Sequence, residues 1–138
     1  MDILTREKRS WNMSRIKGKD TKPEKIVRSA LHKEGFRFRL NRKDLPGKPD
    51  IVLPKYKSVI LVHGCFWHRH PRCKFAYNPK SREKFWQKKF SDNVERDKAV
   101  KKELRKIGWK VIVVWECELK NIKKDKTINR ILKALCQN

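Results

Sequence analysis

The sequence has no hydrophobic run long enough to cross a membrane. Its longest apolar stretches, residues 59–62 and 111–115, are far shorter than the roughly 20 residues that a transmembrane helix needs. The first residues also lack the apolar segment of a secretory signal peptide. We therefore expect a cytoplasmic protein without a membrane partner, whose four cysteines are reduced or metal-bound rather than paired in disulfides.

Acidic residues are scarce in this chain. There are 15 Asp and Glu residues against 38 Lys and Arg residues, which gives a formal net charge of +23. Such a positive field attracts polyanions, so DNA or RNA is the first partner to consider and an anionic membrane surface is the weaker alternative. With 138 residues and no internal repeat, we expect a basic N-terminal arm over residues 1–20 that contacts DNA, and one domain over residues 21–138.

The apolar pattern predicts three helices. A capping box with Thr21 at the N-cap and Glu24 three residues later opens the first, and Gly35 suits its end. A long second helix follows Ser81 as its cap and has a candidate break at Asn93. Isoleucines and leucines at helical spacing mark a third helix near the end of the chain.

Four strands are predicted between and after these helices. Alternating or continuous apolar residues place them at residues 36–40, 50–53, 58–62 and 110–115. The last two are expected to be buried on both faces, with Trp109 and Trp115 in the core. The order helix, three strands, helix, strand, helix predicts an α/β fold with a mixed central sheet and helices on both faces.

One segment concentrates the reactive side chains. The stretch from His63 to Cys73 holds three histidines and two cysteines within eleven residues, around two large aromatic residues. Cys65, His70 and Cys73 are ligands of the kind that hold a structural zinc ion. His63 and His68 can act as an acid, a base or a phosphate contact near neutral pH. This combination suggests chemistry on a nucleic acid.

Asp50 is the candidate ligand for a catalytic metal. It follows a Gly- and Pro-containing loop and begins a short strand, where its carboxylate and a main-chain carbonyl of the next strand can bind Mg²⁺ for phosphodiester cleavage. The acidic-x-Lys triplet that often continues this pattern is absent, because residues 60–62 are Ile-Leu-Val. His68 can replace it as the base, and His63 can contact the phosphate or protonate the leaving oxygen.

The chain resembles the very-short-patch-repair (Vsr) family of DNA mismatch endonucleases. The matching stretches run in one order through nearly the whole chain, and HGCFWH and VWECEL are the most specific of them. They are Asn12-Met13 with Ile16, residues 20–24 (DTKPE), 45–50 (LPGKPD), 63–68 (HGCFWH), 85–86 with Lys89, 93–97 (NVERD), 108–109 and 114–119 (VWECEL).

The resemblance implies a restriction-endonuclease-like fold, with a mixed central sheet flanked by helices. It also implies an active site in which Asp50 is the principal Mg²⁺ ligand and the main-chain carbonyl of Val62 is the second. His68 would be the catalytic base, and His63 a contact to the phosphate or to metal-bound water. Glu24 would be a further catalytic group near the site, a role that is compatible with its place in the capping box.

The resemblance also implies a zinc site and a set of DNA contacts. Zinc would be held by Cys65, His70, Cys73 and Cys117, the last from the end of the final strand. Phe66, Trp67 and Trp86 would be aromatic wedges in the major groove, Met13 and Ile16 would press from the minor groove, and Lys89 would meet a base edge or a phosphate.

The function that the resemblance implies is repair of T:G mismatches that arise when 5-methylcytosine deaminates. The enzyme would nick one strand 5′ of the mismatched T, as a monomer, in functional pairing with a cytosine-5 DNA methyltransferase and with mismatch-repair proteins as further candidate partners. Two alternatives stay open at this point: a restriction-like or structure-selective DNA endonuclease, and a zinc-bearing DNA-binding module without catalysis.

Overall fold

The structure is a computed structural model that describes residues 21–136. Its element order confirms the prediction of a helix, three strands, a helix, a strand and a helix. The elements are α2 (Lys22–Lys33), β1 (Arg39–Leu40), β2 (Ile51–Leu53), η1 (Pro54–Tyr56), β3 (Ser58–His63), α3 (Glu83–Lys106), β4 (Lys110–Trp115), η2 (Glu116–Leu119) and α4 (Lys123–Cys136).

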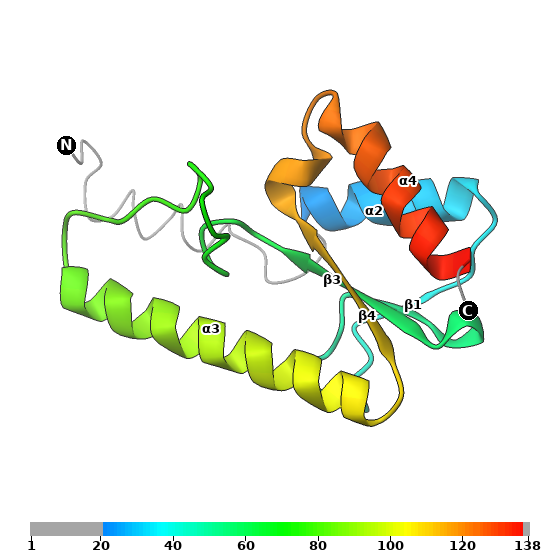
Figure 1. The fold of residues 1–138 in the computed structure, drawn as a ribbon, viewed down its shortest axis with the longest axis horizontal. Helices are drawn as coiled ribbons and strands as arrows, with labels where there is room; N and C mark the ends of the chain where they lie inside the picture. Colours follow the sequence, from blue (N-terminus) through cyan, green and yellow to red (C-terminus); the bar gives the residue numbers. More distant parts are fainter. Residues whose placement is uncertain (1–20, 137–138) are drawn as a thin grey trace.

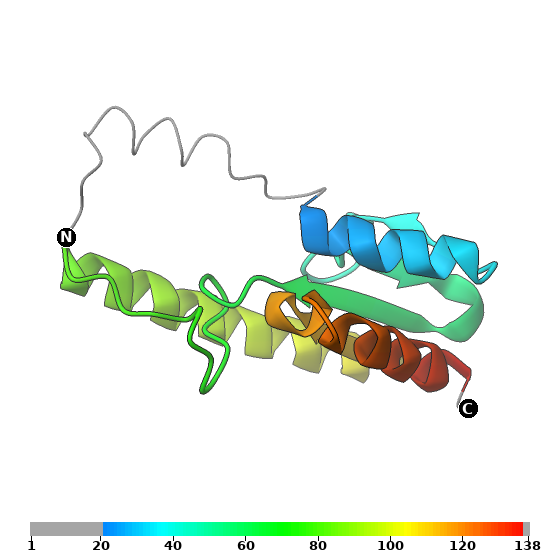
Figure 2. The same ribbon diagram turned by 90° about the horizontal axis from the view of Figure 1, so that it is seen from above.

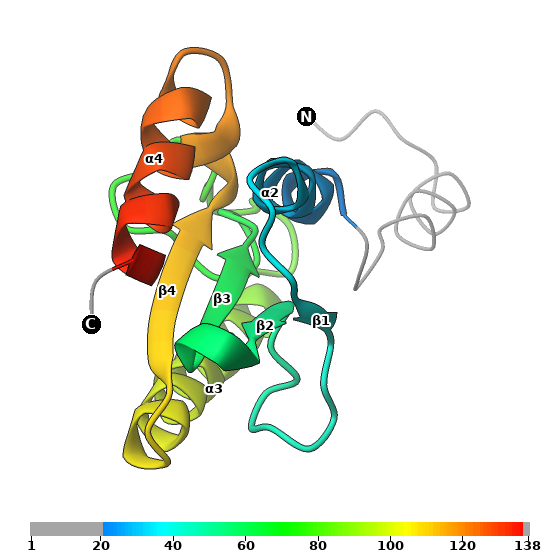
Figure 3. The ribbon, with the colours of Figure 1, turned by 90° about the vertical axis from the view of Figure 1, so that its right-hand side faces the viewer.

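The four strands form one mixed sheet in the order β1-β2-β3-β4 (Figure 3). β1, β2 and β3 are antiparallel neighbours, whereas β4 runs parallel to β3. A parallel pair requires a crossover connection, and α3 supplies it. The sheet is therefore the mixed sheet that the order of predicted elements implied.

Helices cover both faces of this sheet, as predicted (Figure 1). Leu31 of α2 and Ile131 of α4 pack with Ile60 in the larger hydrophobic core on one face. Leu104 of α3 packs with Val59 in a smaller core on the other face. Because alternate residues of a strand point to opposite faces, Val59 and Ile60 serve different cores, which explains why β3 has no polar face.

The burial of β3 and β4 differs. All six residues of β3 are buried, as expected for a central strand, but β4 is the edge of the sheet and only Ile112 and Val114 are buried along it. The prediction that Trp109 and Trp115 lie in the core holds in part: both are half-buried, and Trp109 packs against the smaller core, whereas Trp115, the last residue of β4, belongs to neither core cluster. Trp109 is half-buried with Lys57 over its ring, and Trp115 packs against the ring of His70.

The predicted strand over residues 36–40 is mostly wrong, because only Arg39 and Leu40 pair with β2. The register, Arg39 opposite Val52, would place Phe36 opposite Lys55. That partner lies in the 3₁₀ turn η1, so no strand remains there to continue the ladder. Phe36 packs against the larger core instead of joining the sheet.

Helix ends were predicted with mixed success. Thr21 caps α2 by accepting a hydrogen bond from the Glu24 N–H, and Gly35 follows the helix with a φ of +83°. Ser81 does not cap α3, which begins after Arg82 in a left-handed conformation with no side-chain cap. Asn93 does not break the helix, and its amide donates to the main-chain oxygen of Trp67 instead.

The N-terminal half of α3 projects past the end of the sheet (Figure 2). The segment that connects β3 to α3, residues 64–82, runs beside this projecting half. The two form an arm that carries most of the chain's aromatic residues beyond the sheet. None of the helices between residues 21 and 136 is both long and apolar enough to span a membrane.

Candidate active site and metal centre

The candidate site lies where β3 and β4 end together. These strands are parallel and in register, with His63 opposite Trp115. Cys65, which follows β3, and Cys117, which follows β4, therefore lie at the same end of the sheet. The antiparallel strand β2 begins at this end of the sheet as well, which brings Asp50 next to Val62.

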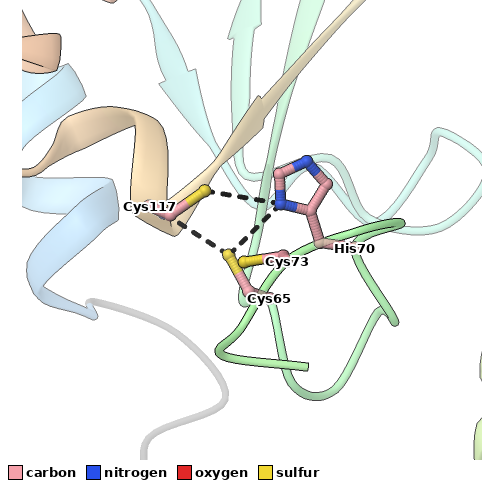
Figure 4. A group of neighbouring side chains, drawn as sticks. All are labelled: Cys65, His70, Cys73 and Cys117. Atoms are coloured by element: carbon pink, nitrogen blue, oxygen red, sulfur yellow. Dashed lines mark hydrogen bonds between the residues drawn. The ribbon is translucent and has the colours of Figure 1, made fainter. Parts of the chain in front are cut away.

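Three thiol groups and one imidazole meet at this end of the sheet (Figure 4). Cys65, His70, Cys73 and Cys117 each offer a ligand atom within 4.8 Å of the others. Nδ1 of His70 lies 3.7 Å from Sγ of Cys65 and 3.4 Å from Sγ of Cys117. The structure thus brings together the four residues that the resemblance assigned to zinc.

The spacing of these atoms fits a tetrahedral zinc ion. Zn–S and Zn–N bonds of about 2.3 and 2.05 Å at tetrahedral angles place a sulfur about 3.6 Å from a nitrogen. The two distances to Nδ1 of His70, 3.7 and 3.4 Å, agree with that value. Burial raises the pKa of Cys65 to about 12, so a thiolate at this position calls for a bound cation. Trp115 stacks on His70 with ring centroids 4.2 Å apart and fixes the orientation of the imidazole.

Asp50 is held against the main chain of β3. The Val62 N–H donates to Oδ2 of Asp50 over 2.7 Å. In an extended strand the N–H and C=O of one residue point to the same side, so the Val62 carbonyl also faces Asp50. The carboxylate and this carbonyl are oxygen ligands of the type that Mg²⁺ prefers, and they fit the predicted metal site.

The charges of Glu24 and Arg28, both on α2, act on Asp50. Burial raises the pKa of Asp50 to about 6, the Val62 N–H and the charges of His68 and Arg28 oppose this rise, and the Glu24 carboxylate adds to it. Glu24 is only 3% exposed, and its Oε2 accepts a hydrogen bond from Arg28 over 3.0 Å. The predicted proximity of Glu24 to the active site is thus consistent with the electrostatic coupling in the structure.

His68 is paired with a carboxylate. Its Nδ1 lies 2.7 Å from Oδ2 of Asp97, which comes from the middle of α3. If Nδ1 carries the proton and donates it to Asp97, Nε2 is left to accept a proton from another group. The ring of His63 stacks on the ring of His68 with centroids 4.0 Å apart and an interplanar angle of 6°.

His63 is buried and electrically neutral. Burial and the nearby charge of His68 lower the pKa of His63 to about 3, with Lys101 adding to the effect and Asp97 opposing it. Its Nδ1 has no hydrogen-bond partner within residues 21–136. One ligand atom each of His63, His68 and Asp97 lies within 4.8 Å of the other two. The two imidazole rings are parallel, however, so their in-plane lone pairs do not point to a common position. This geometry favours a role in proton transfer over a role in metal binding.

The predicted wedge residues lie together on the projecting arm. The ring of Phe66 packs edge-on against Trp67 and Trp86, with centroids 5.1 and 5.6 Å apart. Lys89 places its ammonium 5.9 Å from the ring of Trp67. All three aromatic residues are half-buried against one another, so each serves both packing and the surface. Met13 and Ile16 lie outside the described residues.

Comparison with known proteins decides the family. Residues 1–74 match the family model of the DNA mismatch endonuclease Vsr. The chain is 56% identical to the type II nicking enzyme V.NmeAIP of Neisseria meningitidis serogroup A, over 87% of this chain and 85% of that protein. It is 42% identical to the DNA mismatch endonuclease Vsr of Escherichia coli K12, over 89% of this chain and 78% of that protein.

The chain belongs to the Vsr family of DNA mismatch endonucleases. This confirms the resemblance and makes the protein an endonuclease, which removes the alternative of a DNA-binding module without catalysis. A third relative, the type II nicking enzyme V.XorIIP of Xanthomonas oryzae pv. oryzae, is 50% identical over 88% of each chain.

Two arginines of this Vsr-family chain were missed by sequence reasoning. Arg28 pairs with Glu24, as described above. Arg69 lies with its guanidinium 4.0 Å from the ring centroid of Phe90, and it donates to the main-chain oxygen of Tyr77 over 2.9 Å and to Oδ1 of Asn78 over 2.8 Å. It thus ties the connecting segment to α3 beneath the wedge residues. No sequence signal separates these two from the other 36 basic residues.

Proposed function

We propose that this endonuclease makes a Mg²⁺-dependent nick in one strand of duplex DNA, 5′ of the thymine in a T:G mismatch. The observation that carries the proposal is the convergence of the Asp50–Val62 pair and the His68–Asp97 pair at one edge of the sheet, next to an aromatic arm. A metal-ligand pair and a base held by a carboxylate are the parts that hydrolysis of a phosphodiester requires.

The Asp50 carboxylate and the Val62 carbonyl would hold Mg²⁺. When bound, the ion polarises the phosphate and lowers the pKa of a coordinated water. Asp50 is preset for this role, because the Val62 N–H fixes one of its carboxylate oxygens. The buried Glu24, whose charge acts on Asp50, would add negative charge that favours a divalent cation.

His68 would take a proton from the attacking water on Nε2, while Asp97 holds Nδ1 and stabilises the imidazolium that forms. His63 is neutral at physiological pH, which favours a hydrogen bond to the phosphate or to metal-bound water over donation of a proton to the leaving oxygen. Its buried Nδ1, which has no hydrogen-bond partner among the described residues, would make such a contact.

The projecting arm, formed by residues 64–82 and the N-terminal half of α3, would supply the preference for mismatches. Insertion of Phe66, Trp67 and Trp86 between base steps costs a few kcal/mol per step, and a mismatched step costs less to open. Lys89 would contact a base edge or a phosphate beside the wedge. Met13 and Ile16 of the N-terminal arm would press from the minor groove.

The zinc site would support both parts of the site. Cys65 and His70 flank the segment that carries Phe66, Trp67 and His68, and a zinc ion bound with Cys73 and Cys117 would fasten this segment to the end of β4. Because T:G mismatches arise from deamination of 5-methylcytosine, the expected functional partner is a cytosine-5 DNA methyltransferase. One nick needs one active site, so we propose a monomer acting in the cytoplasm.

The test is cleavage of an end-labelled duplex with one central T:G pair, against the same duplex with T:A, with Mg²⁺ and then with EDTA. We expect a single Mg²⁺-dependent nick 5′ of the mismatched T and little cutting of T:A. Equal cutting of T:A would instead favour a restriction-like enzyme. Preferential cutting of a four-way junction would favour a structure-selective one.

The His68–Asp97 pair gives a separate prediction. Asp97→Asn should lower the nicking rate by about 100-fold, because an amide cannot stabilise an imidazolium as a carboxylate does. Affinity for the T:G duplex, measured without metal, should change little. Asp92→Asn is the matched control, because Asp92 lies on the same helix and is exposed. Equal rates for the two variants would remove Asp97 from the proton-transfer pair.

A further inference from the structure

Tyr77 presents an exposed aromatic ring beside the wedge residues. It is 62% exposed, whereas Phe66, Trp67 and Trp86 are half-buried. Its ring packs against the ring of Phe66, with centroids 4.9 Å apart and an interplanar angle of 31°. Tyr77 therefore extends the aromatic surface of the wedge toward the solvent, and exposed aromatic surface of this kind marks sites of interaction.

The main chain of Tyr77 is held in place by Arg69. The guanidinium of Arg69 donates to the carbonyl oxygen of Tyr77 over 2.9 Å and to Oδ1 of Asn78 over 2.8 Å. It also lies 4.0 Å from the ring centroid of Phe90, which belongs to α3. Because the main chain is already fixed, an exposed ring at this position loses little conformational freedom when it contacts a ligand.

The charge around Tyr77 favours DNA as that ligand. The segment of residues 64–82 contains no aspartate or glutamate. It contains five basic residues, which are Arg69, Arg72, Lys74, Lys80 and Arg82. An aromatic ring among cations suits a polyanion with flat apolar groups, and DNA has both an anionic backbone and the faces of its bases.

We propose that Tyr77 is a fourth aromatic contact to DNA, and that its ring packs against the nucleotide next to the base step that Phe66 opens. Because the two rings are packed together, the Tyr77 ring reaches this nucleotide as Phe66 enters the step. A mismatched step opens at lower cost than a matched one, so the contact adds to discrimination. The inference rests on the proposed function, in which Phe66, Trp67 and Trp86 act as wedges.

The test compares the affinity of variants for the T:G and T:A duplexes, measured by fluorescence anisotropy of labelled DNA without Mg²⁺. Tyr77→Ala should bind the T:G duplex about tenfold more weakly, which is the effect expected for loss of one contact between a base and an aromatic ring. Its affinity for the T:A duplex should change little. Tyr77→Phe keeps the ring and should retain the preference for T:G. A loss in Tyr77→Phe equal to that in Tyr77→Ala would contradict packing by the ring.

Ile122→Ala is the matched control for removal of an exposed apolar side chain. Ile122 is 92% exposed and lies before α4, outside the projecting arm. This variant should leave both affinities unchanged. The melting temperature of Tyr77→Ala should equal that of the unmodified protein, because the ring is exposed. Equal losses in Tyr77→Ala and Ile122→Ala, or equal losses on T:G and T:A, would overturn the inference.

Photo-cross-linking locates the contact without removing the aromatic ring. With p-benzoylphenylalanine in place of Tyr77, the metal-free complex should cross-link to a nucleotide beside the T:G pair. The same group in place of Tyr56, which lies in η1 at the other end of β3, should not cross-link there. Cross-links remote from the mismatch, or none from position 77, contradict the inference even if Tyr77→Ala proves too unstable to measure.

The outcomes for the two proposals are distinguishable. If Phe66→Ala and Trp67→Ala lose the preference for T:G but Tyr77→Ala keeps it, the wedge stands and the role of Tyr77 fails. If neither Phe66→Ala nor Trp67→Ala changes the preference for T:G, the proposed wedge itself fails, and the role of Tyr77 fails with it.

Discussion

Asp50→Asn is expected to lower the rate of nicking by about a thousandfold or more, because a metal that polarises the phosphate supplies several kcal/mol of transition-state stabilisation. The same change should make the metal-free protein more stable. Asparagine can still accept the hydrogen bond that the Val62 N–H now donates to Asp50, but it carries no charge. Loss of activity with a gain of stability is a combination that damage to the fold cannot produce.

The pH dependence of this stability follows from the pKa of Asp50. Burial raises that pKa to about 6, from an ordinary value of 3.8, so the folded state holds a proton that the unfolded state has released between these values. The protein binds more protons folded than unfolded there, and the contribution of Asp50 to stability falls as the pH rises from about 4 to about 6. Above that window the ionised carboxylate costs about 2 kcal/mol, after allowance for its partial exposure.

Thermal unfolding of the unmodified protein and of Asp50→Asn at pH 4 and pH 7.5, without and with Mg²⁺, measures the contribution of Asp50 to stability. Without Mg²⁺, Asp50→Asn should be more stable at pH 7.5 by about 2 kcal/mol and nearly equal to the unmodified protein at pH 4. Mg²⁺ should stabilise only the unmodified protein. Asp44→Asn, an exposed position in the loop that precedes Asp50, is the control. Undiminished nicking by Asp50→Asn would refute the proposed active site.

Removal of Cys117, a proposed zinc ligand, is expected to cause the largest loss of stability. Cys65 and Cys117 lie 52 positions apart in the sequence, and the metal would join the ends of β3 and β4 through them. Structural zinc sites contribute several kcal/mol to folding, so Cys117→Ser should lower the melting temperature by about 10 °C or more. Nicking should be lost as well, because His68 lies between Cys65 and His70 on the segment that the metal would hold.

Cys136→Ser is the matched control for this variant. Cys136 is exposed at the end of α4 and does not belong to the four-residue cluster. Metal analysis of the purified proteins should give one zinc per molecule for the unmodified chain and for Cys136→Ser, and clearly less for Cys117→Ser. If the two serine variants have the same zinc content and the same melting temperature, the cluster is not a zinc site.

Much of this site could be read from local sequence. Cys65, His70 and Cys73 lie within nine residues of the chain, so one short loop is enough to bring their side chains together. The capping residue Thr21 and the buried strand β3 follow from short-range patterns, because capping and periodicity depend on residues only a few positions apart. The prediction of a strand over residues 36–40 was mostly wrong because a local pattern does not determine strand pairing. The residues alternate as in a strand, but β2 is too short to pair with all of them.

The sequence by itself determined which residues are reactive, the excess of positive charge and the order of helices and strands. The contacts between elements required the tertiary structure: the Val62 N–H donates to Asp50, Asp97 pairs with His68, and the charges of Glu24 and Arg28 act on Asp50. These contacts join separate elements, and they depend on strand order, register and the face that each helix turns to the sheet. Periodicity fixes which face of an element is buried, but it does not fix which buried faces meet.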